Sequence, residues 1–547
     1  MSEQAVTVAP SNVKALIYNI RKMPRQEAML FEKKRMIAMA VTDLLRSTGT
    51  LYTTPERRGY FFDTETRTLL ALDEETFAHH LADLTGLNPT EMEFRYVMEH
   101  LRTETYQRGH RTQVYRLAHY NQVAQRIYVT DFSSGMWVLD GRSVVHAPNG
   151  ESGVLFATPL LASPYAYLSS EKRSNGSTLR AFLEPIRFDP MAGLSPDEWR
   201  DLLFVWILSL FFPELHPTKL IPTFIGSHGS TKTTTARRLG MQLLGERFNV
   251  GSIETGDRGE QAFVATVCGK PFAVFDNADA PVRWLPDRLA TFATGHEFEL
   301  RELYTTNQLV VYKPSAQLVL TSRDPHFRRP DVAERLFICR LVRPERFIPE
   351  SVIFAQTLEN RDAVWSDLLD LLNQTLIALQ GVPVAPLLNY RMADFASFGW
   401  RLSHARGGSE ASERFCQSLA HLETEQARYT TEEDPVAACL TAWLSAPMNL
   451  NREIETGELY VELIEIARKQ GLLLPKTSAS LGKRLHSARR ALELDLGVKI
   501  GVKSTTHTSS WVFSTATESP LPTHPAPLWT TSNGGQEAQD GQERKTL

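Results

Sequence analysis

The sequence predicts an α/β protein with several domains. Its 547 residues are too many for one hydrophobic core, and a chain of this length is expected to form about three or four domains. In the middle, an apolar run at residues 221–225 leads into a loop of Gly, Ser and Thr and then into a helical pattern that reaches Leu244. Toward the end, residues 434–514 carry three helical patterns and two short strand patterns. The first arrangement is typical of an α/β core and the second of a compact terminal domain.

Composition and charge narrow the classes of protein only slightly. An apolar share of 42% is ordinary for a globular chain, and a net charge of −4 neither demands nor excludes a nucleic-acid partner. The longest apolar run, residues 202–212, is about half the length that crosses a bilayer, and the N-terminus lacks the apolar core of a signal peptide. We therefore expect a cytoplasmic protein without a membrane partner. The cysteines lack metal-ligand spacing and are expected to be buried reduced thiols: Cys268, Cys339, Cys416 and Cys439.

The N-terminal part combines helical patterns with short strand patterns. Helical spacing runs through residues 16–45 and is interrupted at Pro24. The next patterns are a hairpin around 60–72, helices near 75–86 and 90–107, and short strands between 126 and 157. Residues 158–195 are rich in Pro, Ser and Gly, which is typical of a linker. The sequence of this half has no acidic cluster of the kind that a polymerase or primase uses, so the role of the domain stays open.

A phosphate-binding loop follows the apolar run at residues 221–225. Strand, loop and helix in this order are the context that a P-loop needs, because backbone N–H groups of the loop and of the helix N-terminus cradle phosphates. Lys232 is expected to reach the β and γ phosphates of ATP, and Thr233 to place its hydroxyl on Mg²⁺. The expected nucleotide-binding residues are Gly226, Ser227, His228, Gly229, Ser230, Thr231, Lys232, Thr233 and Thr234.

The loop departs from the usual pattern at one position. Thr231 stands where a second glycine is usual, and a loop that needs a positive φ there would be strained. Gly229 and Ser230 compensate in part, because these small residues allow the loop backbone to approach the phosphates closely at an earlier position. A chance turn of Gly, Ser and Thr is the alternative.

Two later strands end in polar side chains that suit the same site. Residues 271–275 form an apolar strand that ends in Asp276, where a carboxylate would hold the Mg²⁺ shell together with Thr233. Asn277 stands where many such ATPases have a glutamate that activates water. Because an amide is no base, hydrolysis is expected to be slow or to depend on Asp279 or on an acid from elsewhere. A third strand, residues 317–320, leads to Thr321 and Ser322, and Ser322 is expected to position the attacking water.

Between the second and third strands the chain resembles the superfamily 3 helicases of phages, plasmids and small DNA viruses. The order is a Thr294-Gly295 turn, a strand with Arg301 and Tyr304, a hairpin, Lys313-Pro314 and the third strand. The resemblance is closest to ATP-binding primase/helicase-type proteins of bacterial mobile elements, and it covers roughly residues 200–515. The chain departs from the family in two ways: Thr321-Ser322 replaces its usual asparagine, and Thr231 replaces a loop glycine.

The resemblance implies a P-loop AAA+ core, a hexameric ring, and ATP hydrolysis that moves the ring along DNA. The hairpin would lie in the central channel, where Arg301, Tyr304 and Lys313 would touch the phosphates or stack on the bases of single-stranded DNA. Without the resemblance, a hairpin with a polar tip is more often a solvated turn than a DNA contact, and Tyr304 is as readily structural.

A long cation near the third strand is the candidate arginine finger. A short helix ends at Arg335, just before the apolar run 336–339, which places it at a rim where it would act on the ATP of a neighbouring subunit. A helix-capping arginine that pairs with Asp331 is the alternative, and Arg328 or Arg329 are further candidates.

The terminal domain has the element order of a winged helix. Its helical patterns cover about 435–445, 456–470 and 478–494, and its strands about 498–503 and 511–513. Basic residues on the third helix and on the strand pair would bind duplex DNA through phosphates. The candidates are Lys483, Arg490, Lys499 and Lys503. A solvated charged face is the alternative.

The expected fold is therefore a multidomain α/β protein with a superfamily 3 helicase-like AAA+ core. The expected parts are an accessory N-terminal α+β domain and linker (1–190), the P-loop AAA+ ATPase core (196–345), a helical lid (346–433), a winged helix (434–514) and a disordered tail (515–547). The expected function is that of an ATP-dependent DNA helicase or replication initiator of a mobile element. Asn277 favours one alternative, a regulatory or defence AAA+ ATPase that assembles on DNA without unwinding it. A scaffold that holds ATP only structurally is another.

Overall fold

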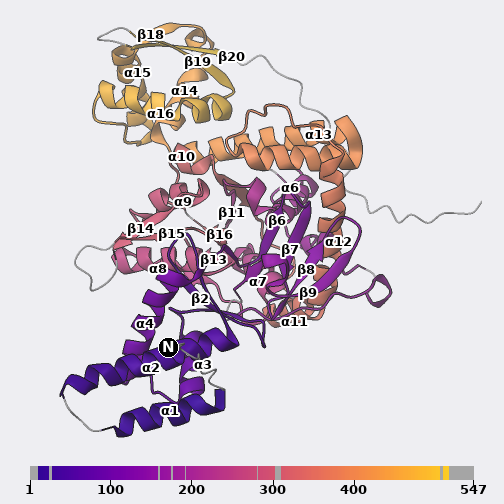
Figure 1. Ribbon diagram of the computed structural model, residues 1–547. Coiled ribbons are helices and arrows are strands. Elements are labelled where there is room, and N and C mark those ends of the chain that lie inside the picture. Colours follow the sequence, from indigo (N-terminus) through magenta and orange to yellow (C-terminus); the bar gives the residue numbers. More distant parts are fainter. Residues whose placement is uncertain are drawn as a thin grey trace, which may run out of the picture.

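A sheet of five parallel strands lies at the centre of the protein (Figure 1). The computed structural model describes residues 10–23, 27–157, 161–173, 176–190, 193–279, 281–301, 309–323, 325–504 and 509–515. The strands stand in the order β12-β13-β16-β11-β17, and every neighbouring pair is parallel. Their bounds are β11 (Ile221–Ile225), β12 (Gly251–Ser252), β13 (Phe272–Asp276), β16 (Gln317–Ser322) and β17 (Leu336–Arg340).

Helices cover both faces of this sheet, which explains why its strands are almost continuously apolar. Along β13, Phe272 and Val274 pack into one hydrophobic core, and Ala273 and Phe275 pack into the other. The first core contains α6 (Pro196–Ser209) and α7 (Lys232–Leu244). The second contains α8 (Gly256–Gly269), α9 (Leu285–Ala293) and α10 (Pro330–Ala333). Helix α6 begins with a complete capping box between Ser195 and Glu198 and is buried along most of its length.

A hairpin is inserted between β13 and β16, as the sequence predicts. Its strands β14 (Phe298–Arg301) and β15 (Leu309–Tyr312) pair antiparallel, with Phe298 opposite Tyr312. The expected DNA contact Tyr304 lies outside the described residues. For Arg301 the structure describes only the backbone, which pairs with Leu309.

The N-terminal region has a hydrophobic core of its own. The predicted hairpin is present, with Tyr60 opposite Ala71, and it belongs to a sheet of order β3-β2-β1-β4. The helices are α1 (Pro10–Lys22), α2 (Glu27–Thr48), α3 (Glu75–Thr85) and α4 (Met92–Arg108). The strands are β1 (Gly49–Thr53), β2 (Gly59–Asp63), β3 (Leu69–Ala71) and β4 (His110–Arg111).

The next strands form a meander that shares its core with the central region. The sheet order is β6-β7-β8-β9, and all neighbouring pairs are antiparallel. The bounds are β6 (Ala118–Asn121), β7 (Arg126–Thr130), β8 (Gly135–Leu139) and β9 (Val144–Pro148); β5 (Val114–Tyr115) pairs separately with β10 (Leu155–Phe156). Short 3₁₀ helices are η1 (Glu151–Gly153), η2 (Ser170–Lys172), η3 (Pro213–Leu215) and η4 (Pro447–Asn449).

The stretch 158–195, expected as a linker, packs against the core in its described part. Tyr165 stacks on Trp365 with ring centroids 4.0 Å apart, and Phe182 in α5 (Leu179–Leu183) is buried. Phe188 forms a β-bridge with Leu341. The stretch is rich in Pro, Ser and Gly on average, but it also contains widely spaced aromatic residues whose side chains pack into the core. The meander is therefore tied to the central region rather than separated from it.

A helical segment follows the central sheet, at the place where the sequence predicts one. It consists of α11 (Glu350–Glu359), α12 (Arg361–Gln380) and α13 (Ala393–Thr431), and α13 is kinked at Gly407 and Gly408. Although α12 and α13 are long, no helix in the described ranges is apolar over enough residues to cross a bilayer.

The terminal region rests on α13 (Figure 1) and has its own core. Its elements are α14 (Pro435–Leu444), β18 (Glu453–Glu455), α15 (Thr456–Gln470), α16 (Ser478–Leu496), β19 (Val498–Ser504) and β20 (Ser509–Thr515). The three helices and the strand pair agree with the sequence prediction. The short strand β18, which completes a sheet of order β18-β20-β19, was not predicted.

Candidate functional site

The candidate site begins at the carboxyl end of β11. There the chain forms the loop 226–231 and enters α7, while β11 itself lies between β16 and β17. The next strand, β12, lies at the far edge of the sheet, and ligands of open α/β sheets bind where the strand order jumps in this way. Only glycine fits at position 226, because a Cβ there would lie 2.3 Å from the carbonyl oxygen of Leu341.

The unusual residue of the loop adopts the backbone conformation that a glycine would adopt without strain. Thr231 has φ 58° and ψ 20°, a left-handed conformation that costs a β-branched residue about 1–3 kcal/mol. The prediction that this position carries strain is confirmed. The carbonyl oxygen of Thr231 accepts a hydrogen bond from the backbone N–H of Thr235 at 2.8 Å, which starts α7.

The ammonium group of Lys232 lies inside the loop. Its Nζ donates to the carbonyl oxygens of Gly226 at 2.7 Å and Ser227 at 3.0 Å, and lies 3.4 Å from the hydroxyl of Ser230. Burial lowers the pKa of Lys232, while the carboxylates of Asp279 and Asp276 oppose that shift. The cation is thus held in the middle of the loop that would surround a phosphate.

Hydroxyl and carboxylate groups meet beside this lysine. The Thr233 hydroxyl donates to Oδ1 of Asp276 at 2.7 Å, and the Thr321 hydroxyl donates to the same oxygen. One hydroxyl and one carboxylate are oxygen ligands that suit Mg²⁺ when substrate phosphates supply the rest. Within the described ranges, no group of three or more His, Cys, Asp or Glu is placed to hold a metal by itself. Thr233 and Asp276 therefore fit a Mg²⁺ ion that is shared with a nucleotide.

Asn277 has no carboxylate, but Asp279 supplies one close by. The side chain of Asn277 is exposed, and its backbone has φ 51°. Asp279, two residues on, accepts hydrogen bonds through Oδ1 from the Ser322 hydroxyl at 2.5 Å and from the backbone N–H of Arg323 at 2.7 Å. The structure brings Ser322 and Asp279 together at the edge where Lys232 lies.

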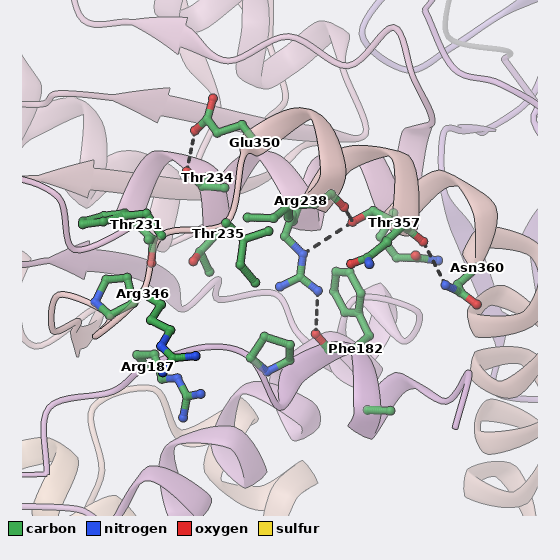
Figure 2. Close-up of a pocket in the computed structure, with 18 of the residues that line it drawn as sticks. Phe182, Arg187, Thr231, Thr234, Thr235, Arg238, Arg346, Glu350, Thr357 and Asn360 are labelled. Carbon is green, nitrogen blue, oxygen red and sulfur yellow. Dashed lines mark hydrogen bonds between the residues drawn. The ribbon is translucent and has the colours of Figure 1, made fainter. Parts of the chain in front are cut away.

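A cavity of about 1190 Å³ continues from the loop along α7. Figure 2 shows Arg187 and Arg346 beside Thr231 at one end, and Arg238 further along between Phe182 and Thr357. The walls are α7, α5 with its flanking turns, and the chain from 342 to 364. The Thr234 hydroxyl spans the gap to α11 by donating to Glu350 at 2.6 Å. The sequence does not predict this cavity, although Thr235, Arg238 and Gln242 recur on one face of α7.

Arg335 does not lie on an exposed rim, in contrast to the expectation. It is 8% exposed, its guanidinium donates to the carbonyl oxygen of Asp331 one turn earlier, and burial lowers its pKa. This is the capping arrangement that the sequence left open as the alternative. The other two candidates also have partners: Arg329 pairs with Asp287 and Asp331, and Arg328 pairs with Glu432 and Glu433.

The predicted DNA-binding residues have different surroundings. Lys313, Lys483 and Lys499 are exposed. Arg490 and Lys503 are also exposed, but each pairs with a carboxylate: Arg490 with Glu423 of α13 at 2.6 Å, and Lys503 with Glu453 of β18 at 2.6 Å. The packing of α16 on α13 therefore occupies part of the basic face that the sequence assigned to DNA.

The comparison with protein families bears on the central region. Residues 192–425 match the family model of the actinomycete integrative conjugative element replication protein. This part of the chain is similar to a replication protein. The match includes the central sheet, the loop, both carboxylates and most of the helical segment. No curated protein matches the sequence.

Several solved structures are similar over large parts of the chain, but only loosely. The apo C-terminal region of NrS-1 is 11% identical and covers 87% of this chain and 98% of its own, with a TM-score of 0.36. The JCV helicase is 16% identical, covers 44% of this chain and 64% of its own, and has a TM-score of 0.20. Cdc6p from Pyrobaculum aerophilum is 12% identical, covers 60% and 95%, and has a TM-score of 0.15. Superpositions this loose carry no argument about function.

Proposed function

We propose that the protein is an ATP-dependent DNA helicase or replication initiator of a mobile genetic element. In this proposal a P-loop AAA+ core is followed by a helical lid and a winged helix. One observation carries it: Lys232 and the Thr233–Asp276 pair meet at the carboxyl edge of the parallel sheet, inside the segment that is similar to a replication protein.

Binding of the triphosphate would use the loop and the start of α7. The helix N-terminus offers unpaired N–H groups and partial positive charge to the phosphates. Lys232, which now donates to loop carbonyl oxygens, would turn to the β and γ phosphates. Thr233 and Asp276 would hold Mg²⁺, which neutralises charge on the phosphates when it is bound.

Hydrolysis needs a group that accepts a proton from the attacking water. Asn277 lacks this ability. The Asp279 carboxylate accepts a hydrogen bond from Ser322, which ends β16, the strand next to β13. We assign proton acceptance to Asp279 and orientation of the water to Ser322. The water oxygen bonds to the γ phosphorus, the bond from that phosphorus to the bridging oxygen breaks, and the proton passes first to Asp279 and then to the released phosphate.

Contacts with DNA would come from two places. The exposed Lys483 and Lys499 of the terminal region would meet duplex phosphates, joined by Arg490 and Lys503 once their carboxylate partners are exchanged for phosphates. The inserted hairpin, with Arg301, Tyr304 and Lys313, would grip single-stranded DNA in the channel of a ring. The ring and its hexameric state belong to the proposal through the resemblance to superfamily 3 helicases. Arg335 would act as the finger of the ring only after it leaves its capping bond with Asp331.

A regulatory ATPase that assembles on DNA without unwinding is the second candidate. Asn277 favours it, because a site without the usual glutamate suits slow hydrolysis and a long-lived bound state. The two candidates share nucleotide and DNA binding and differ in whether strands separate.

A strand-displacement assay on forked DNA separates these candidates. The helicase proposal predicts displacement with ATP and Mg²⁺, no displacement with a non-hydrolysable analogue, and none with Lys232→Ala. Lys270→Ala, at an exposed position outside the loop, is the matched control and should displace normally. ATP-dependent DNA binding without displacement would support the regulatory ATPase instead.

A further inference from the structure

The cavity beside the loop follows one face of α7. Thr231, Thr235, Arg238 and Gln242 line it and are spaced by four, three and four residues, so they lie on the same side of the helix. From Thr234, near the loop, to Gln242 the helix rises about 12 Å. The cavity therefore has a phosphate end, where Figure 2 shows Arg187 and Arg346 beside Thr231, and a far end at Gln242.

Arg238 brings a buried cation into the middle of this cavity. Its Nη2 donates to the carbonyl oxygen of Phe182 at 3.0 Å, its Nε lies 3.4 Å from the Thr357 hydroxyl, and its guanidinium lies over the ring of Phe182 at 4.6 Å. Burial lowers its pKa to about 10, and no carboxylate of the described chain pairs with it. Such a cation retains N–H groups for an electron-rich ligand.

Gln242 brings a buried acceptor to the far end. The residue is 5% exposed, and its Nε2 donates to the carbonyl oxygen of Arg361 at 3.1 Å. That bond fixes the orientation of the amide, because the opposite orientation would set two oxygens against each other. The remaining Oε1 has no hydrogen-bond partner within the described residues. A buried acceptor of this kind favours a ligand that supplies an N–H group.

We propose that this cavity holds the base of the bound nucleotide and that Arg238 and Gln242 select adenine over guanine. The proposal rests on the proposed function, because the triphosphate must first bind at the loop. Helical side chains lean toward the N-terminus, so the amide of Gln242 lies closer to the loop than its backbone does. The distance that remains between the loop and this amide would be filled by the ribose and the base.

The selection follows from the pattern of donors and acceptors on the two bases. Adenine carries an amino group beside ring nitrogens that accept, so the amino group would donate to Oε1 of Gln242 and a ring nitrogen would accept from Arg238. Guanine carries a carbonyl oxygen where adenine has the amino group. That oxygen would face Oε1 of Gln242, and two acceptors without a proton between them repel.

Binding of three triphosphates to the full-length protein tests this proposal. ATP, purine riboside triphosphate and inosine triphosphate differ at base carbon 6, which carries an amino group, a hydrogen or a carbonyl oxygen. Inosine also carries a hydrogen on ring nitrogen 1, where the other two bases have an acceptor. The wild-type protein should bind ATP roughly 10- to 100-fold more tightly than inosine triphosphate, with purine riboside triphosphate between them. This series needs no variant, so it does not depend on how a substitution folds.

A variant locates the preference. Gln242→Met keeps the length of the side chain, removes the acceptor and should bring the three dissociation constants together. Gln380→Met, at the exposed end of α12 and outside the cavity, should keep the wild-type order. Equal binding of the three triphosphates by the wild-type protein, or an unchanged order in a folded Gln242→Met, would overturn the base selection alone. Binding of none of them by the wild-type protein would overturn the proposed function as well.

Discussion

At the scale of single residues, the site was predictable where its chemistry is local. The loop lysine, the threonine after it and the acid at the end of β13 were all assigned from sequence, and the structure brings them within hydrogen-bond distance of one another or of the loop. Arg238 and Gln242 were not, because their role depends on walls from residues 176–187 and 342–364, which lie far away in the sequence. The sequence predicts an exposed rim position for Arg335, whereas its side chain is buried against its own helix.

Thr231→Gly should stabilise the protein. Glycine adopts the left-handed conformation of this position freely, which removes a strain of about 1–3 kcal/mol and costs about 0.5–1 kcal/mol in chain entropy. Urea unfolding should show a gain of about 1 kcal/mol in the free energy of unfolding. Thr234→Gly, inside the first turn of α7, is the matched control and should lower it. A loss of stability in Thr231→Gly would mean that the threonine side chain contributes more than its strain costs.

Asp279→Asn should separate nucleotide binding from hydrolysis. The substitution keeps the shape of the side chain and removes its ability to accept a proton, so turnover should fall by about 10²–10⁴-fold while ATP still binds. Single-turnover hydrolysis and fluorescent-nucleotide binding measure the two properties separately. Asp257→Asn, exposed on α8, should leave both unchanged. If Asp279→Asn hydrolyses ATP at the wild-type rate, another group accepts the proton from the attacking water.

At the scale of elements, the hydrophobic periodicity of the sequence predicts the longer helices and strands but not the short ones. The inserted hairpin and the third helix of the terminal region appear where the sequence puts them. Helix α5 and strand β18 were missed because five and three residues are too few to show a period. The sequence predicts a basic DNA-binding face on α16, whereas one side of this helix packs on α13 through the Arg490–Glu423 pair.

Exposed lysines of the terminal region should carry its affinity for duplex DNA. Lys483→Ala together with Lys499→Ala removes two phosphate-facing charges, so affinity should fall by similar factors on unrelated sequences. The slope of log affinity against log salt should flatten by about 2. Titrations at several salt concentrations measure both effects. The double substitution of Arg468 and Lys469 by alanine, on exposed positions of α15, is the control and should change neither. An unchanged slope in the lysine variant would mean that this region serves assembly.

At the scale of the whole molecule, the sequence predicts a linker between the N-terminal region and the central region, and the described part of that stretch packs into the core instead. Residues 158–195 have the composition of a linker, yet Tyr165 and Phe182 from that stretch belong to the same hydrophobic core as α6, α7 and Trp365. Composition reports how polar a segment is on average, and a few well-placed aromatic residues reverse that expectation. The meander β6–β9 is thereby joined to the region that surrounds the site.

A ring that shares its sites between subunits makes a prediction of its own. Arg335→Ala should bind ATP and hydrolyse it poorly, and mixing it with Lys232→Ala should restore part of the activity. Restoration is expected because one protomer then supplies an intact loop and its neighbour supplies the arginine. ATPase rates across mixing ratios measure this. Full ATPase activity in a monomer would contradict the ring, and loss of folding in Arg335→Ala would assign the arginine to the capping bond with Asp331.

The central claim is that the loop at residues 226–233 binds and hydrolyses ATP for work on DNA. Its most direct test is the ATPase rate of the wild-type protein and of Lys232→Ala, each with Mg²⁺ and with or without single-stranded DNA. We predict that the wild-type rate depends on Mg²⁺ and rises with DNA, and that Lys232→Ala loses hydrolysis while it keeps its fold by circular dichroism. Turnover at the wild-type rate in a folded Lys232→Ala would contradict the site and the function built on it.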